Sequence, residues 1–567
     1  MDRPEPQTHS SFCRLTAPSS TLVPALAGSV LCWLAFPPVG WSYLAWVGPV
    51  PWMLLVLEQK LPGRGPYRAL WLSGVVFWLL AVHWIRLPHP LNYVAWFALA
   101  AYLGVYLPTF VALSRVGVLR LGLPLVLVAP VVWTGLDWFR GRLFTGFLMG
   151  SLAHTQVNHL SLIQIADLTG EYGVTFLIIL VAASIAQTLR AFSSASEPGH
   201  PRSLRIGALL LLLPAAIALA VTAYRGQASI AEIEQQTSRS GPRIALIQGN
   251  SLADWKSDAE KQQQIMDEYL RLSRQAVRDN PDIDLVIWPE TAFRETLVTV
   301  EEGYPPPPER VPQENIAAAK DYLKLLTREL GTAVLVGIDR VHVFPDATGQ
   351  PTFRAYNSSV LVDASGQIVG TYDKMHRVPF GEYIPFADWL PALYKLTPLT
   401  GGIEAGTRPA GLVLNDVVIC PSICYETAVP QLISTQASFY GDYSSTGYLP
   451  VLVNLTNDAW FWGSSELDMH LACGVFRAVE NRIPLVIAAN GGLSAYIDAT
   501  GRVVQVSPRQ QTTTLVVDLD LTYVSSFYRN FGDWLPLACV LCCMVLTVVG
   551  WRGRHVRNAV AGAGTAR

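Results

Sequence analysis

Long apolar runs alternate with short polar segments over the first 225 residues. A helix needs about 20 apolar residues to cross a bilayer, and this pattern predicts seven crossings before residue 225 and an eighth near the end. Residues 139–171 are too polar and broken to cross, so we expect a long external loop at the interface. The predicted crossings lie near 20–37, 41–58, 68–85, 92–114, 120–138, 172–190, 205–223 and 533–551.

Between the last two of these runs, β-rich stretches alternate with polar helical ones. Helical spacing of apolar residues predicts helices over 257–279 and 312–330, and the sequence DASG at 363–366 predicts a hairpin turn. Alternating helices and strands are typical of a layered α/β domain. Strands are predicted at 244–250, 284–290, 333–339, 357–363, 367–373, 417–426, 450–458, 484–490, 493–499 and 513–520.

Positive charge in the short loops predicts the orientation. One set of loop sides carries Arg3, Arg14, Lys60, Arg64, Arg68, Arg115, Arg120, Arg190, Arg202, Arg205, Arg552, Arg554, Arg557 and Arg567, and the other only Arg86, Arg140 and Arg142. The side richer in Lys and Arg faces the cytoplasm, and no cleavable signal pattern precedes residue 20. We therefore predict a cytoplasmic segment 1–19, a seven-helix domain 20–224, an extracytoplasmic domain 225–532, a transmembrane helix 533–551 and a cytoplasmic tail 552–567.

Composition agrees with a membrane protein. The chain has 567 residues, of which 51% are hydrophobic and 15% charged, and it carries 17 tryptophans, a residue that favours membrane interfaces. A net charge of −2 gives no sign of a nucleic-acid partner. The eight cysteines do not have the spacing of a disulfide framework or a zinc site. Four of them lie in apolar runs and are expected to act as small hydrophobes: Cys32, Cys539, Cys542 and Cys543.

Three reactive side chains end three of the predicted strands. Cys424 follows one in Ile-Cys-Tyr-Glu, Glu290 another in Val-Ile-Trp-Pro-Glu, and Lys374 a third in Gly-Thr-Tyr-Asp-Lys. Taken singly, they are more often a packed thiol, a surface carboxylate and a solvated lysine. Together, a glutamate can serve as general base for a thiol, while a lysine favours the thiolate and a tetrahedral oxyanion. The set therefore indicates acyl transfer through a thioester.

These motifs, with Val-Pro-Phe-Gly-Glu at 378–382, resemble the carbon–nitrogen hydrolase (nitrilase) superfamily over about residues 243–520. The resemblance implies an α-β-β-α sandwich and a Glu-Lys-Cys triad. Seven spans before such a domain and one after it resemble the bacterial apolipoprotein N-acyltransferase family, and that likeness covers essentially the whole chain. It implies an inner-membrane protein, likewise predicted to be a monomer, whose catalytic domain is periplasmic.

The family resemblance also implies a reaction. A phospholipid, commonly phosphatidylethanolamine, donates the acyl group, and the N-terminal amine of a diacylglyceryl-modified apolipoprotein accepts it. The carried-over roles are general base for Glu290, oxyanion stabiliser for Lys374, nucleophile for Cys424 and an orienting carboxylate for Glu382. No metal or cofactor is called for, and the chain has no Walker A or dinucleotide motif.

Softer matches concern binding and local contacts. Trp462 departs from the family, which usually has glycine after the aromatic pair. No further metal-ligating residues accompany His376 and His470 in the sequence, and both are interpreted as local hydrogen-bonding residues. Substrate contact is implied for Trp255, Tyr425, Glu426, Trp460 and Phe461.

Two other functions stay open. A membrane-tethered amidase or nitrilase acting on a small soluble amide would use the same triad, but would need a water-facing pocket and tolerate removal of the spans. A transporter or scaffold with an inactive external domain would need functional charges within the spans. Apart from Asp137 there is little such charge, which makes that reading weak.

Overall fold

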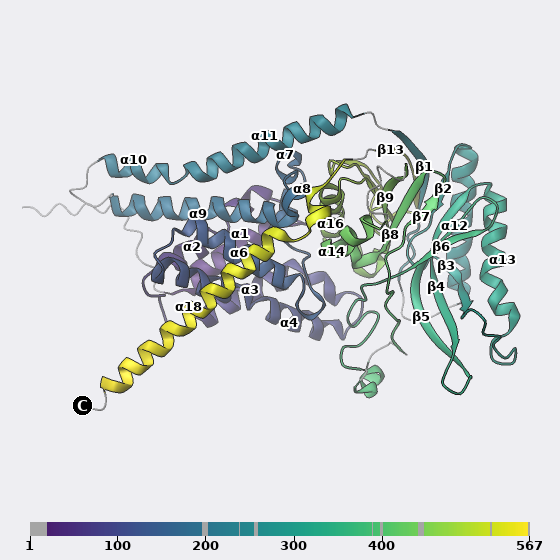
Figure 1. The fold of residues 1–567 in the computed structure, drawn as a ribbon, viewed down its shortest axis with the longest axis horizontal. Helices are drawn as coiled ribbons and strands as arrows, with labels where there is room; N and C mark the ends of the chain where they lie inside the picture. The colour runs from purple at the N-terminus through teal and green to yellow at the C-terminus, as the bar shows by residue number, and fades with distance from the viewer. Residues whose placement is uncertain are drawn as a thin grey trace, which may run out of the picture.

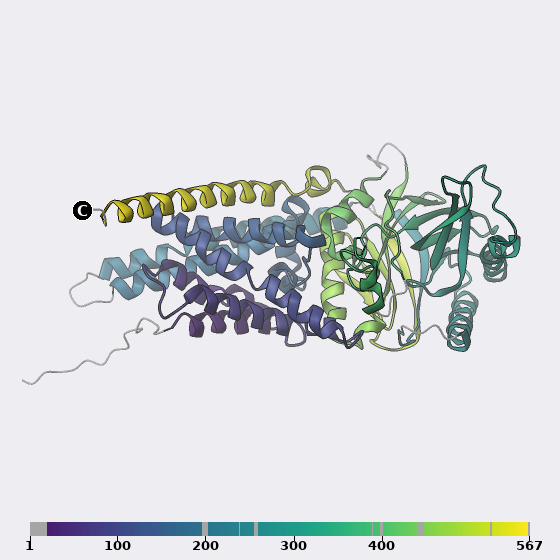
Figure 2. The same ribbon diagram turned by 90° about the horizontal axis from the view of Figure 1, so that it is seen from below.

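The molecule is elongated, with a helical bundle at one end and a two-sheet sandwich at the other (Figures 1 and 2). The C-terminal helix α18 (Trp534–Gly564) leaves the sandwich and runs back along the bundle, so that the chain ends far from the sheets. The computed structural model describes residues 20–195, 202–236, 239–253, 259–387, 389–396, 401–439, 447–521 and 524–564.

Each predicted apolar run contains helix. Within the described ranges, four helices are long and apolar enough to cross a membrane, namely Asn92–Arg120, Glu171–Ala195, Ile206–Gln235 and Trp534–Arg552. The remaining runs form shorter helices, so eight crossings stay a prediction. The elements of the bundle are α1 (Leu22–Leu34), η1 (Ser42–Trp46), α2 (Val50–Leu57), α3 (Pro66–Ala81), η2 (His83–Arg86), α4 (Asn92–Leu103), α5 (Tyr106–Arg115), η3 (Val116–Arg120), α6 (Leu125–Arg140), α9 (Glu171–Ala195), α10 (Arg202–Leu210) and α11 (Leu213–Gln235).

The predicted external loop at 139–171 folds into short helical turns at the junction between bundle and sandwich. Its backbone groups are thereby paired locally, as a segment enclosed between two packed bodies requires. α17 also lies at this junction and leads into α18. These elements are η4 (Leu143–Thr145), η5 (Leu152–Gln156), α7 (Leu160–Ile163), α8 (Ala166–Thr169) and α17 (Phe527–Phe531).

Two mixed sheets make the sandwich. The first has the order β13-β1-β2-β4-β5-β6, with β3 also paired to β4, and the second has the order β12-β11-β10-β9-β8-β7. The strands are β1 (Arg239–Gln248), β2 (Leu285–Ile287), β3 (Phe293–Val300), β4 (Ala333–Pro345), β5 (Pro351–Val362), β6 (Ile368–Asp373), β7 (Leu412–Leu414), β8 (Val417–Ile423), β9 (Leu449–Asn457), β10 (Leu485–Asn490), β11 (Ala495–Ile497), β12 (Val503–Val506) and β13 (Thr513–Leu521).

Helices cover the outer face of each sheet. On the first sheet, α12 (Ala259–Asp279) and α13 (Gln313–Leu330) bury Met266 and Leu323 in one apolar core with strand residues such as Val334. A second core fills the space between the sheets. On the second sheet, α14 (Pro430–Ala437) and α16 (Glu466–Asn481) share a core with the bundle. The predicted α-β-β-α sandwich is thus confirmed, and the antiparallel pairing of β5 with β6 confirms the hairpin at 363–366.

Among the described elements of this domain, three strands (β3, β7 and β12) and three helices (α14, α16 and α17) were not predicted. α16 escaped prediction because it lacks the solvent-facing stripe that gives a surface helix its pattern. Nearly all its residues are buried, including charged ones such as Glu466, Arg477 and Glu480. It lies between the second sheet and the bundle (Figure 1).

Buried ion pairs join α16 to the bundle. The Nη2 of Arg477 lies 2.7 Å from Oε2 of Glu171, at the start of α9, and the Nε lies 2.8 Å from Oε2 of Glu480. The Nη2 of Arg482 lies 2.8 Å from Oδ2 of Asp167 in α8. Because buried charges are stable only when paired, these contacts fix the sandwich in one position on the bundle.

Candidate active site

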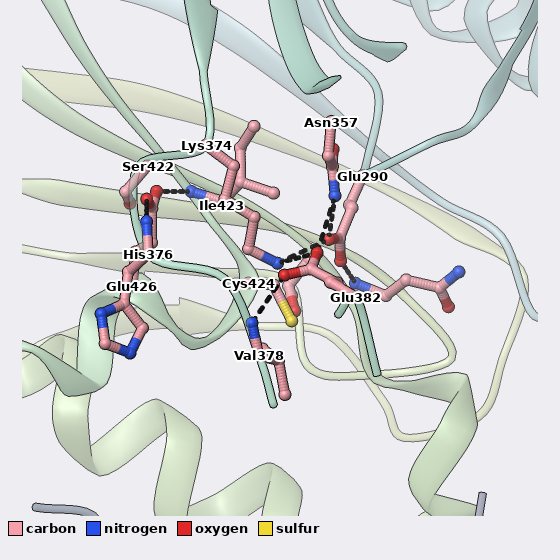
Figure 3. Close-up of polar contacts among 12 residues, drawn as sticks. Glu290, Asn357, Lys374, His376, Val378, Glu382, Ser422, Ile423, Cys424 and Glu426 are labelled. Atoms are coloured by element: carbon pink, nitrogen blue, oxygen red, sulfur yellow. Dashed lines mark hydrogen bonds and ion pairs between the residues drawn. The ribbon is translucent and has the colours of Figure 1, made fainter. Parts of the chain in front are cut away.

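Three strand ends meet in the sandwich beside Cys424. Glu290 follows β2, Lys374 follows β6, and Cys424 follows β8 of the opposite sheet. The Nζ of Lys374 lies 3.2 Å from Oε1 of Glu290. Figure 3 shows the sulfur of Cys424 next to these two groups and to the carboxylate of Glu382. The structure therefore brings together the four residues that the sequence singles out for catalysis.

Lys374 is held as a buried cation between two carboxylates. Its side chain is 1% exposed, and Nζ also lies 2.7 Å from Oε1 of Glu382. Burial alone would lower the pKa of Lys374, but the negative charges of Glu290 and Glu382 outweigh burial and raise the pKa well above its ordinary value. The ammonium group is therefore available to stabilise a negative oxygen close to Cys424.

Glu290 is oriented by three donors. Its Oε1 accepts from Asn357 Nδ2 at 2.7 Å as well as from Lys374, and its Oε2 accepts from the backbone N of Asn457 at 3.0 Å. Its backbone passes close to Gly337 of β4, where an added Cβ would collide with Pro289 and Glu290. The carboxylate is thus fixed, as a group that collects a proton from a neighbouring thiol needs to be.

Glu382 comes from the loop between β6 and β7. One of its oxygens accepts from Lys374, and the other accepts from the backbone N of Val378 at 2.8 Å. Asn357 Nδ2 lies 3.4 Å from it, which links it to Glu290. The second carboxylate therefore ties the loop to Lys374 and orients the ammonium group.

Cys424 opens the short helix η7 (Cys424–Ala428) with a φ of 54°, in the left-handed region. Non-glycine residues are rare there and are held by their surroundings, frequently at functional sites. Burial and the negative charge of Glu290 raise the pKa of the Cys424 thiol well above its ordinary value, against the opposing effect of Lys374. The resting site accordingly holds a thiol that needs a base.

This raised thiol pKa predicts a pH dependence. The thiolate fraction is small at pH 7 and grows as pH rises toward the thiol pKa, so alkylation of Cys424 by iodoacetamide should accelerate by about tenfold per pH unit from pH 7 to 9. Peptide mass spectrometry of the Cys424 peptide gives the rate, with glutathione as a reference whose rate levels off. A plateau below pH 8 would instead indicate a preformed thiolate–lysine pair.

Glu426 lies behind the nucleophile. It is fully buried, and its carboxylate accepts from the backbone N of Ile423 at 2.7 Å, of Met375 at 2.7 Å and of His376 at 2.9 Å, and from the hydroxyl of Tyr372 at 2.8 Å. Burial raises its pKa to about 7, although these donors oppose the shift. Glu426 therefore connects the segment that carries Lys374 to the segment that carries Cys424, and its contact with substrate stays a prediction.

The aromatic candidates are divided between the site and the bundle. Tyr425 stacks on Phe147 with ring centroids 6.2 Å apart, and Phe461 meets Trp84 of η2 edge to face at 5.1 Å. Trp460 and Phe461 belong to η8 (Asp458–Phe461). Trp462 follows in the left-handed conformation, with φ 50°, where glycine would carry no strain. Trp255 lies outside the described residues.

Sequence reasoning missed the residues that support this constellation. Asn357 sits within a predicted strand and carries no motif that marks it, yet it connects both carboxylates. His470, expected to make local hydrogen bonds, contacts Thr427 and the carbonyl of Cys424. Two acidic side chains that the sequence did not connect with it, Asp458 and Glu466, lie close to His470.

Comparison with known proteins agrees with both halves of the molecule. The family model "Apolipoprotein N-acyltransferase N-terminal domain" matches residues 28–184, and "Carbon-nitrogen hydrolase" matches residues 243–529. An amidase from Nesterenkonia sp. of known structure covers 53% of this chain and 96% of its own, with 19% identity and a TM-score of 0.34.

Two curated relatives match nearly end to end. The apolipoprotein N-acyltransferase of Geobacter metallireducens is 34% identical, covering 96% of this chain and 99% of its own. That of Rhodopirellula baltica is 30% identical, covering 94% of this chain and 98% of its own. This chain therefore belongs to the apolipoprotein N-acyltransferase family and carries the carbon–nitrogen hydrolase domain of an acyltransferase.

Proposed function

We propose that this protein transfers a fatty acyl chain from a phospholipid, through a thioester on Cys424, to the N-terminal α-amine of the diacylglyceryl-cysteine of an apolipoprotein. The observation that carries the proposal is the cluster of Glu290, Lys374 and Glu382 beside Cys424, in a domain docked on a bundle with four helices suited to a membrane. The reaction would be the last step of lipoprotein maturation.

In the first half-reaction, Glu290 takes the proton of the Cys424 thiol, and the sulfur attacks an ester carbonyl of the phospholipid. The carbonyl oxygen becomes an oxyanion, which the Lys374 ammonium stabilises. When the C–O bond breaks, the leaving alkoxide takes the proton from Glu290 and departs as a lysophospholipid. The acyl group stays on sulfur as a thioester.

In the second half-reaction, the acceptor amine attacks the thioester, and Lys374 again stabilises the oxyanion. Glu290 takes a proton from the amine as the C–N bond forms and returns it to the sulfur as the C–S bond breaks. The product is an amide, and the free thiol is restored. Because the donor product leaves before the acceptor reacts, the kinetics should be ping-pong.

We also propose where the protein lies in the cell. We place the chain in the bacterial inner membrane as a multi-pass monomer, with 20–224 and 533–551 in the bilayer, 225–532 in the periplasm, and both ends in the cytoplasm. The phospholipid donor in this scheme is phosphatidylethanolamine, the donor that the family resemblance implies. The loop-charge asymmetry supports the orientation, and the contact of Phe461 with Trp84 supports a position of the site close to the helical bundle.

The deciding experiment uses the full chain in liposomes with phosphatidylethanolamine radiolabelled in its sn-1 acyl group. We expect a hydroxylamine-sensitive label on the protein, which a diacylglyceryl-cysteinyl peptide with a free N-terminus discharges with amide formation. The matched control is the same peptide with its amine acetylated, which should leave the label in place. Absence of label, together with hydrolysis of small amides such as propionamide, would favour the tethered amidase.

A further inference from the structure

The backbone carbonyl of Cys424 is held by side chains that belong to none of the four proposed catalytic residues. Its oxygen lies 3.2 Å from His470 Nε2, 3.2 Å from Asn454 Nδ2 and 3.3 Å from Thr427 Oγ1. His470 Nε2 also lies 2.6 Å from Thr427 Oγ1. A carbonyl with this many neighbouring donors cannot rotate freely, which restrains the ψ angle of the nucleophile.

His470 is aligned in turn by Asp458. Its Nδ1 lies 3.3 Å from Oδ1 of Asp458, which also accepts from the hydroxyl of Thr456 at 2.6 Å. Both members of the pair are buried, His470 at 3% exposure and Asp458 at 3%. The arrangement Asp458–His470–Cys424 carbonyl is a continuous chain of hydrogen bonds that ends on the nucleophile's own backbone.

Burial and the neighbouring carboxyl groups shift the pKa values of two side chains in this cluster, His470 and Glu466. Burial alone would lower the pKa of His470, but the carboxylate of Asp458 outweighs burial and raises the pKa to about 9, so both ring nitrogens carry protons at neutral pH. Glu466 faces the same pair, and burial together with Asp458 raises its pKa well above the ordinary value.

We propose that His470, aligned by Asp458, is a positioning residue for the nucleophile. Its Nε2–H contacts both the carbonyl of Cys424 and the hydroxyl of Thr427, which itself donates to that carbonyl, and these contacts restrain Cys424 in its left-handed conformation, with the sulfur near Glu290 and Lys374. The inference rests on the proposed role of Cys424 as nucleophile. The segment 456–458 then holds both the proposed base and the positioning histidine. The backbone N of Asn457 donates to Glu290, and Asp458 pairs with His470.

Two variants of the full chain separate a hydrogen-bond donor from a space-filling ring. His470→Gln keeps a donor close to the Nε2 position, while His470→Phe keeps the bulk and removes the donor. We expect His470→Phe to lower kcat for thioester formation at least 30-fold, with KM for phosphatidylethanolamine within twofold of the parent. His470→Gln should recover kcat to within fivefold. His342→Phe, in the distant strand β4, is the matched control.

The pH profile supplies a readout that a purely structural role would not move. In the parent, kcat should decline as pH rises through about 9, because His470 loses the proton that it donates. His470→Gln should lack this alkaline limb, and Asp458→Asn should move it at least one pH unit lower. If His470→Phe does not fold, the position of the alkaline limb in Asp458→Asn still tests the proposal.

The proposal is overturned if His470→Phe keeps kcat within threefold of the parent, or if the alkaline limb persists in His470→Gln. One equivalent of a divalent metal in the parent, lost in His470→Gln by elemental analysis, would also overturn it by making the cluster a metal site. Histidine ring ¹⁵N spectra need no activity, and they should show one ring protonated at both nitrogens at pH 8 that is missing in His470→Gln. A parent that forms no thioester would instead count against the proposed function.

Discussion

Replacing Cys424 by alanine should abolish the acyl–enzyme and lower kcat/KM for acyl transfer by at least about 10⁴-fold, the size of effect seen when a covalent nucleophile is removed. The variant retains Glu290, Lys374 and Glu382, but none of these can form the thioester. Protein labelling from acyl-labelled phosphatidylethanolamine and the rate of peptide acylation are the two measurements.

Cys420→Ala is the matched control for this change. Cys420 lies four residues earlier in β8, is buried at 1% exposure and belongs to the core next to α14 and α16. Its loss should cost a little stability and leave the labelling intact. Labelling of the Cys424→Ala protein at the parent's level would refute the mechanism, whatever the fate of the control.

Replacing Glu290 by glutamine should lower kcat by about 10² to 10⁴-fold, the contribution of a positioned general base. The change is nearly isosteric, yet the new amide cannot take the thiol proton. It also turns an NH₂ group toward one of the donors that now bind the carboxylate, namely Asn457 N on one oxygen or Lys374 and Asn357 on the other. Steady-state acylation of the peptide measures the loss.

A second readout distinguishes a lost base from a damaged site. Because the charge of Glu290 raises the thiol pKa of Cys424, Glu290→Gln should make alkylation of Cys424 by iodoacetamide at pH 7 faster while acyl transfer becomes slower. Glu309→Gln, at an exposed position, is the control and should change neither rate. A parallel fall of both rates would mean that the substitution disturbs the site as a whole, and would argue against the assigned role.

The sequence placed the four central residues because each stands in a strongly local pattern. An apolar run ending at Trp-Pro-Glu or Ile-Cys-Tyr-Glu puts a functional side chain at a strand end, and this holds whatever packs around it. The sandwich layers followed from the same alternation of strands and helices. Features that depend on a single strand or turn could therefore be predicted from the sequence alone.

The remaining features arise from tertiary contacts. Asn357 and Asp458 matter because they contact side chains that are far away in the sequence. Such contacts leave no local sequence pattern from which they could be predicted. The left-handed conformation of Cys424 depends on donors from β9 and α16. Helix ends also shift once packed: α11 continues to Gln235, well beyond the predicted boundary near 223, as it approaches the first strand.

The ion pairs along α16 bear on how this enzyme can be divided. A fragment beginning at β1 would retain the catalytic cluster but lose Glu171 and Asp167, so that Arg482 would lose its carboxylate partner and Arg477 would keep only Glu480. Arg477 lies in the same helix as His470, and Arg482 directly follows the end of that helix. The helical bundle is thus part of the scaffold that holds α16, and through His470 it bears on the nucleophile.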